Sequence, residues 1–222
     1  MGNYHFNITG VNGSMPPGHS RRPFEPMKFT LTYEGPLPSS GNPRGRHIHT
    51  GDPKAIVKWT MRRKFARQLS HFFDLELPLQ NVGPNRNAAA AHVRQPVIVS
   101  DIPFLPLVRG APLDLICELD IKMLVNHEPG SLVVSPGDLD NRVKTLIDAL
   151  RVPDANALKG ANDIPNPCHC LLADDAIVTK LNIRTERWLN AESEDIQQVK
   201  LDIGVDITTR RSNFYTEVFG IH

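Results

Sequence analysis

The stretch LICELDIKMLV, residues 115–125, has an apolar side chain at every second position from Leu115 to Val125, with polar residues between them at 118, 120 and 122. A period of two is typical of a β-strand that has one face in the core and one in water. We therefore predict a long strand over residues 113–125, in which Cys117 is a small core residue. The clearest alternation in the chain, residues 199–207, predicts a final strand of the same kind.

The run GDLDNRVKTLIDAL, residues 137–150, has a helical period instead. It predicts a helix that starts near Asp138 to Asp140. The expected buried face consists of Val143, Leu146, Ile147 and Leu150.

A second helix is expected to begin at Asp52, because Asp is a good N-cap and Pro53 fits the first helical position. Its apolar residues form one stripe: Val57, Met61, Phe65, Leu69 and Phe72. Its cations lie largely off that stripe, which predicts a strongly cationic face made of Lys54, Lys58, Arg62, Arg63 and Arg67.

Three shorter runs complete the pattern. Alternation at residues 29–33 and 176–186 predicts two more strands, and residues 97–99 fit a short one. Strand, helix, strand, helix, strand, strand is the order of a single α+β domain in which helices cover a mixed sheet.

Several segments lack apolar periodicity. We interpret residues 1–27 as a flexible arm. Residues 209–222 are expected to be a C-terminal extension that packs against a surface. Between them, residues 28–208 form the domain. Residues about 80–96 are expected to be an insertion, and residues 151–170 a loop that is rich in proline and glycine.

Composition excludes some classes of protein. No apolar run reaches the roughly 18 residues of a membrane span, and no secretory signal is present, so a cytoplasmic location follows by default. Three cysteines are too few for a disulfide framework. Cys168-His169-Cys170 lacks a second ligand pair at zinc-finger spacing, so we favour a loop in a reducing compartment over a zinc site.

The net charge of +1 conceals an asymmetry. Residues 1–75 carry 11 Lys and Arg against 4 Asp and Glu, and the remainder carries 14 against 20. A basic half and an acidic half suit a protein that grips phosphates and also holds cations. Local variation in composition explains the same numbers.

Two acidic motifs attract attention. Asp138 and Asp140 stand where the chain enters the helix, with Lys144 and Asp148 at four-residue spacing on one face. Asp174-Asp175 precedes the strand at 176–186. Each motif alone fits a structural role, as an N-cap, a surface charge ladder or a turn.

The two motifs together suggest metal chemistry. Carboxylates about 4 Å apart repel by roughly 4 kcal/mol at an effective dielectric of 20, so a converged cluster needs a cation. Hard oxygen ligands select Mg²⁺, with Mn²⁺ as a substitute. Water on such an ion can attack a phosphodiester, and a nearby lysine can stabilise the phosphate charge.

At these residues the sequence resembles the RusA family of Holliday junction resolvases. The signature Asp-x-Asp-Asn, Lys, Asp-Ala/Gly-Leu appears as Asp138-Leu139-Asp140-Asn141, Lys144 and Asp148-Ala149-Leu150. The later acidic pair appears as Leu172-Ala173-Asp174-Asp175. The resemblance covers roughly residues 28–208, and the chain is longer than a typical member.

The resemblance implies a homodimeric, Mg²⁺-dependent endonuclease that cuts branched DNA such as Holliday junctions. Asp138, Asp140 and Asp175 would hold the metal with help from Asp174, and Lys144 would be the catalytic cation. The phosphate contacts would be Arg44, Arg46, Lys58, Arg62 and Arg63. Two alternatives remain open: a nuclease for other DNA or RNA structures, and a non-catalytic nucleic-acid-binding module.

Overall fold

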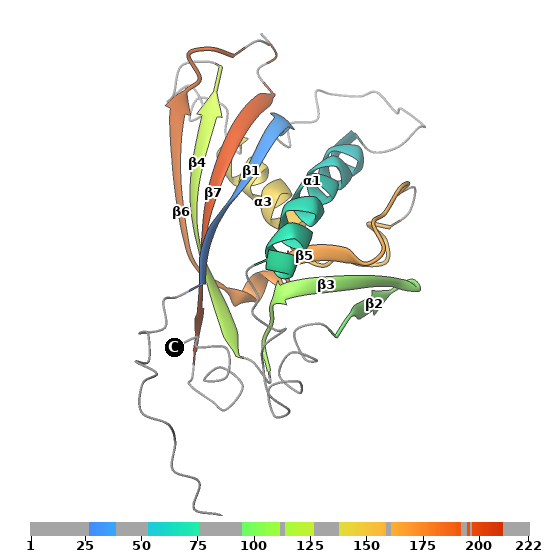
Figure 1. Ribbon diagram of the computed structural model, residues 1–222. Helices are drawn as coiled ribbons and strands as arrows, with labels where there is room; N and C mark the ends of the chain where they lie inside the picture. Colours follow the sequence, from blue (N-terminus) through green and yellow to red (C-terminus); the bar gives the residue numbers. More distant parts are fainter. Residues whose placement is uncertain are drawn as a thin grey trace, which may run out of the picture.

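Two β-sheets and two α-helices make up the described chain (Figure 1). The computed structural model describes residues 27–38, 53–75, 95–111, 114–126, 138–158, 161–191, 195 and 197–210. In chain order, the elements are β1 (Met27–Pro36), α1 (Pro53–Leu75), β2 (Val97–Val99), β3 (Ile102–Val108), β4 (Leu115–Val125), α3 (Asp138–Leu150), β5 (Cys168–Leu172), the 3₁₀ turn η3 (Asp175–Ile177), β6 (Val178–Arg187) and β7 (Gln198–Thr209).

The larger sheet contains the strands that alternation predicted, in the order β1-β7-β4-β6. β7 runs antiparallel to both β1 and β4, whereas β4 and β6 are parallel. Parallel neighbours need a long crossover connection. Here α3 and β5 lie within that crossover, so the first acidic motif follows the end of β4 and the second precedes β6.

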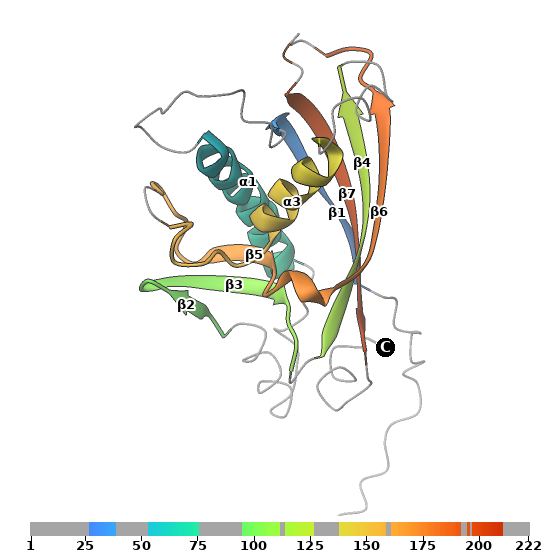
Figure 2. The ribbon, with the colours of Figure 1, turned by 180° about the vertical axis from the view of Figure 1, so that it is seen from behind.

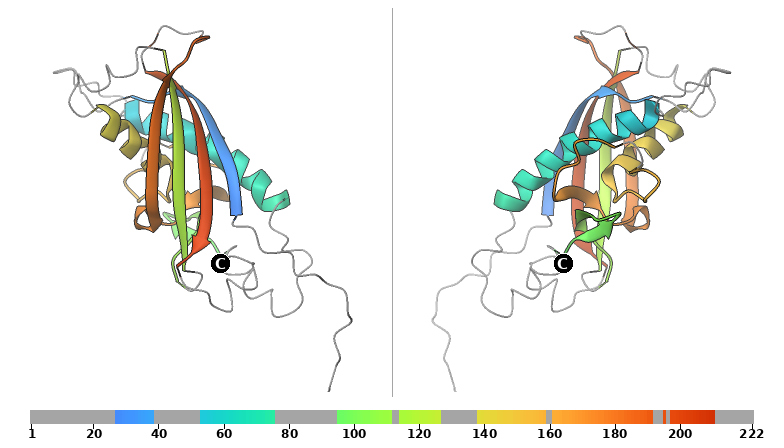
Figure 3. Two further views of the ribbon diagram at one scale, coloured as in Figure 1. Left: turned by 90° about the vertical axis from the view of Figure 1, so that its left-hand side faces the viewer. Right: turned by 90° about the vertical axis from the view of Figure 1, so that its right-hand side faces the viewer.

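Both helices cover the same face of this sheet (Figure 3). The predicted strand stripes face them, and Cys117, Ile121, Ile203 and Ile207 have no exposed surface. The predicted α1 stripe also reaches this core, with Met61, Phe65 and Leu69 fully buried and Val57 and Phe72 partly buried against it. Burying one such aliphatic side chain contributes about 1.5–3 kcal/mol.

The smaller sheet, β2-β3-β5, differs from expectation in two places. β3 was not predicted, because Pro103 and Pro106 lack the amide hydrogen that a central strand uses. The expected loop at 151–170 ends earlier than predicted, since β5 begins at Cys168 and pairs in parallel with β3. The buried apolar side chains of β5 favour a strand there, although prolines directly precede it.

One edge of the larger sheet is held by side chains from α1. The Gln68 side chain accepts a hydrogen bond from the Thr32 amide at 2.9 Å and donates one to the Thr32 carbonyl at 2.8 Å. Lys64 donates to the Glu34 carbonyl at 2.5 Å. These bonds satisfy backbone groups of β1 that an unprotected edge would offer to another chain.

The expected fold class, α+β in a single domain, is confirmed. The arm at 1–26, most of the insertion at 80–96 and the tail at 211–222 lie outside the described residues. None of the helices in the described part of the chain has the length and apolarity needed to cross a bilayer.

Candidate functional site

The first acidic motif forms the opening turn of α3, as predicted. Asp138 is the first helical residue, and Asp140 is exposed. Lys144, one turn further along, is also exposed. Carboxylates in the first turn are favourable because the helix dipole places partial positive charge there. A carboxylate and an ammonium group are therefore presented to solvent on one helical face.

Asp148, the third member of the ladder, has a structural role. Its half-buried carboxylate accepts from Lys58 Nζ at 3.5 Å and from Arg151 Nε at 3.2 Å. Both partners come from outside the predicted ladder, one from α1 and one from the residue after α3. Lys144 has no ion pair with Asp148 among the described contacts, so its ammonium group is available at the surface.

The second acidic pair forms the turn that leads into β6. The Asp174 carboxylate caps η3 by accepting a hydrogen bond from the Ala176 amide at 2.8 Å. That bond, followed by a bond from the Asp175 side chain, lowers the pKa of Asp174. Both acids are exposed. Asp174 is thus used as a cap, and Asp175 is the freer of the two.

The two acidic motifs lie at opposite ends of α3. The end of the helix adjoins β5, since the Val152 amide donates to the Leu172 carbonyl at 3.0 Å and Arg151 bridges to Leu172. η3 follows three residues later, at the end of the sheet where β6 begins (Figure 2). A 13-residue helix is about 20 Å long, and Asp138 begins it at the far end.

Convergence of Asp138, Asp140 and Asp175 on one metal ion stays a prediction, because the side chain of Asp138 lies outside the described residues. Across the described ranges, no three His, Cys, Asp or Glu side chains are placed to hold one metal ion. Asp140 and the Asp174-Asp175 turn lie toward opposite ends of α3. Sequence spacing could not reveal this separation, because it depends on the direction in which α3 crosses the sheet.

The cationic face predicted for α1 is only partly exposed. Arg62 is 3% exposed, and its guanidinium donates to the Asp148 carbonyl. Lys58 pairs with Asp148, and Arg63 donates to the Asn162 carbonyl at 3.3 Å. Trp59 also donates to the Ala157 carbonyl, at 2.9 Å. These contacts hold the chain between the two acidic motifs against α1.

Arg62 is consequently not a surface phosphate contact, contrary to expectation. Arg44 and Arg46 lie outside the described residues. Lys64 and Arg67 are exposed cations on this part of α1, and both line a groove of about 590 Å³ with Lys200 of β7. Glu34 and Asp202 also line this groove, so its charge is mixed with a small positive excess.

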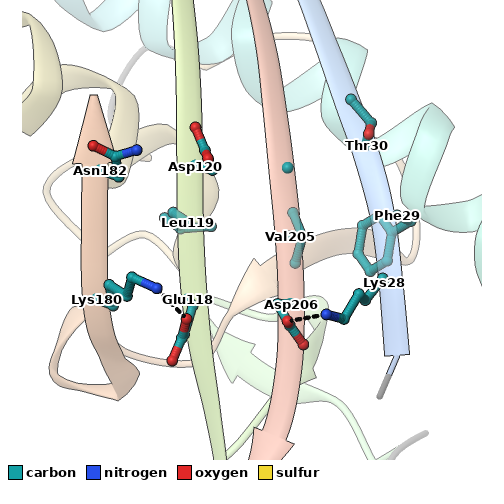
Figure 4. A pocket seen from close by; sticks show the side chains of 11 residues that line it. Lys28, Phe29, Thr30, Glu118, Leu119, Asp120, Lys180, Asn182, Val205 and Asp206 are labelled. Atoms are coloured by element: carbon teal, nitrogen blue, oxygen red, sulfur yellow. Dashed lines mark hydrogen bonds and ion pairs between the residues drawn. The ribbon is translucent and has the colours of Figure 1, made fainter. Parts of the chain in front are cut away.

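A second hollow, of about 480 Å³, lies on the outer face of the larger sheet (Figure 4). Asp206 pairs with Lys28 at 2.8 Å, and Glu118 pairs with Lys180 at 3.1 Å. Asp120 lies beside Gly204, whose missing side chain deepens the hollow. These acids occupy the outward positions of the alternating strands, so the strand pattern in the sequence already indicates an acidic outer face. Because two of the three acids have lysine partners, charge within this hollow is largely balanced.

The cysteines of Cys168-His169-Cys170 are core residues. Cys168 is 0% and Cys170 4% exposed, and both face the small core between β5 and α1. His169 points to the opposite side of the strand, where its ring contacts Phe73 at a centroid distance of 5.0 Å. Alternation along β5 therefore divides this trio between two faces, which disfavours a shared zinc ion.

No family model matches the chain, and no curated protein or solved structure matches it. The class that the fold defines is a single α+β domain with a crossover between parallel strands. The resemblance to the RusA family rests on the sequence motifs alone.

Proposed function

We propose that this protein is a Mg²⁺-dependent endonuclease acting on branched DNA, with its catalytic centre at the start of α3. The observation that carries the proposal is the exposed Asp140–Lys144 pair, one helical turn apart, in a helix that begins with a second aspartate. The resemblance to the RusA family supports the choice of substrate.

The proposed metal site uses fewer protein ligands than the sequence suggested. Mg²⁺ in phosphoryl-transfer sites is often held by one or two carboxylates together with waters and substrate phosphates. Asp138 and Asp140 would supply those carboxylates. Bound there, the ion would polarise the phosphodiester and provide an activated water. Mn²⁺ would replace it.

Lys144 has a separate role in this proposal. An ammonium group one turn from the carboxylates can donate to a non-bridging phosphate oxygen and stabilise the charge that develops there. Asp174 and Asp175 follow the other end of α3, so this proposal does not require them in the same coordination sphere.

DNA binding would use the groove of Lys64, Arg67 and Lys200, together with Arg44 and Arg46. Such contacts position the backbone and carry no sequence information. A homodimer would present two catalytic centres to the two strands of a symmetrical junction. Dimer formation and a cytoplasmic location are parts of this proposal.

Cleavage of a labelled four-way junction tests the assignment. With Mg²⁺ present, Asp140→Asn should reduce the cleavage rate by about 100-fold or more, a loss of roughly 3 kcal/mol. Asp120→Asn is the matched control, because Asp120 is also exposed but lies on the outer face of the sheet. Equal cutting by wild type and Asp140→Asn would refute the proposal. A preference for linear DNA or RNA would change the assigned substrate but leave the assigned catalytic centre in place.

A non-catalytic binding module is the second candidate. The observation that favours it is that no three-acid group occurs among the described residues. Its test is thermal unfolding with and without Mg²⁺, because a ligand that binds the native state raises the melting temperature. An unchanged melting temperature at millimolar Mg²⁺ and no cleavage would favour this candidate.

A further inference from the structure

β6 forms one end of the larger sheet. Its paired neighbour among the described strands is β4, and the strand order ends there (Figure 3). Its other side carries backbone amide and carbonyl groups that no strand in the described part of the chain pairs with. At the opposite end of the sheet, Lys64 and Gln68 of α1 already bind such groups of β1. β6 is therefore the edge at which a further strand fits.

An apolar side chain is exposed beside this edge. Leu181 is 41% exposed although it lies on the helix-covered face, opposite the buried Leu119 of β4. Ile183, two residues further along the same face, is partly buried against the core. A strand added at β6 would cover both side chains, because neighbouring strands lie only about 4.8 Å apart. The edge thus offers apolar surface as well as backbone groups.

The outer face of β6 carries charges of both signs. Lys180, Arg184 and Glu186 are all exposed there, with Asn182 between the first two. Charges on an edge strand usually hinder pairing. In an antiparallel pair, however, unlike charges that face each other stabilise the pair and like charges destabilise it. The order of the charges along β6 therefore decides which register is favoured.

Two copies of β6 can pair only in certain registers. Residues directly opposite in an antiparallel pair lie on the same face and share the same hydrogen-bonding type, so the two-fold axis must pass through a residue. Axes at Asn182 and at Ile183 keep nearly all of the strand paired. The first places Lys180 opposite Arg184 of the second copy, which is a pair of like charges. The second places Lys180 opposite Glu186, and Arg184 opposite the uncharged Asn182.

The register at Ile183 also extends two ion pairs that each chain already contains. Lys180 binds Glu118 of β4 at 3.1 Å (Figure 4). Glu186 binds Lys122 of β4 at 2.8 Å. With the strands paired, these side chains form one row of alternating charge across the junction: Glu118 and Lys180 of one copy, then Glu186 and Lys122 of the other. Exposed ion pairs contribute most when several charges form a network.

We propose that two copies of this chain associate through antiparallel pairing of β6 with β6, about a two-fold axis at Ile183. The pairing joins the two four-stranded sheets into one continuous sheet and covers Leu181. Since the axis is perpendicular to that sheet, α3 of both copies lies on the same face, and both candidate catalytic centres point to the same side. The pairing rests on the proposed function in so far as a homodimer is part of it, and it gives that homodimer a surface.

Sedimentation velocity at several protein concentrations, without DNA or divalent metal, tests the pairing. The wild type should show a reversible equilibrium between monomer and dimer. Lys180→Glu and Glu186→Lys each replace two attractions in the dimer by two repulsions, so each should raise the Kd of the dimer by about tenfold or more. Lys28→Glu is the matched control and should leave the Kd unchanged. Lys28 is similarly exposed and also pairs with an acid, Asp206, but it lies on β1 at the other end of the sheet.

A mixture of Lys180→Glu chains with Glu186→Lys chains separates a lost contact from a lost fold. In the mixed dimer, both pairs at the junction again join unlike charges. The mixture should therefore recover a dimer that neither variant forms alone at the same concentration.

Three results would overturn the proposal: a wild type that stays monomeric up to about 1 mM, a dimer that both single variants retain, and a mixture that stays monomeric. None of them bears on the metal site. Conversely, wild-type cleavage by Asp140→Asn would refute the catalytic centre and leave the β6 dimer in place.

Discussion

Arg62 of α1 donates a hydrogen bond to the backbone carbonyl of Asp148, two residues before the end of α3. The carboxylate of the same aspartate binds Lys58 and Arg151. The sequence predicts that the basic face of α1 binds nucleic acid. Part of that face instead contacts α3 and the residue after it.

Arg62→Ala should destabilise the fold by about 2–3 kcal/mol, since it removes the hydrogen bond to the Asp148 carbonyl and the packing of a buried side chain on Trp59. Arg67→Ala, an exposed position on the same helix, should change the free energy of unfolding by less than about 0.5 kcal/mol. Urea denaturation measures both. Equal effects of the two substitutions would show that Arg62 is not a buried structural residue.

The misplacement of Arg62 has a clear physical origin. One apolar stripe was expected on α1, but the helix packs on the larger sheet and also on β5. Trp59 and Ala66 mark the second buried face, with Arg62 between them at helical spacing. Because these two apolar residues stand among charged ones, the sequence pattern does not indicate a second apolar stripe on the helix.

Other parts of the fold were easier to predict. β4 and β7 alternate cleanly because one face is buried and the other is in water. β3 and β5 do not show such alternation. Both strands are short, contain or follow prolines, and pair with each other. In the candidate site, the sequence located the start of α3 and the turn at Asp174-Asp175. The distance between them is set by the crossover.

Gln68→Ala should destabilise the protein by about 1–2 kcal/mol, because two hydrogen bonds to Thr32 are lost at the edge of the larger sheet. The exposed edge should also increase self-association. Urea denaturation and light scattering measure the two effects, with the exposed His71→Ala as control. Wild-type behaviour of Gln68→Ala in both assays would contradict this role of the side chain.

Asp174→Ala should lower stability by about 1 kcal/mol through loss of the cap on η3, whereas Asp174→Asn should retain most of it. Because the pKa of Asp174 is lowered from its ordinary value of 3.8, its contribution is present above that pH and is lost in stronger acid. Urea midpoints at neutral pH and in acid reveal whether the difference between wild type and Asp174→Ala shrinks as predicted. A constant difference would exclude the charged form as the cap.

Arg67→Glu combined with Lys200→Glu should weaken binding to a four-way junction and reduce its salt dependence by roughly two phosphate contacts. Arg184→Glu, an exposed cation of β6, is the control. Fluorescence anisotropy in the absence of divalent metal separates binding from cleavage. The groove is not the DNA surface if the double variant binds as wild type does.

Binding of Mn²⁺ to the wild type, Asp140→Asn and Asp175→Asn, measured by titration calorimetry, tests the position of the catalytic centre most directly. We predict that Asp140→Asn loses metal affinity by at least about tenfold, or 1.4 kcal/mol, while Asp175→Asn binds as the wild type does. Loss of binding in Asp175→Asn with retention in Asp140→Asn would contradict a metal centre at the start of α3.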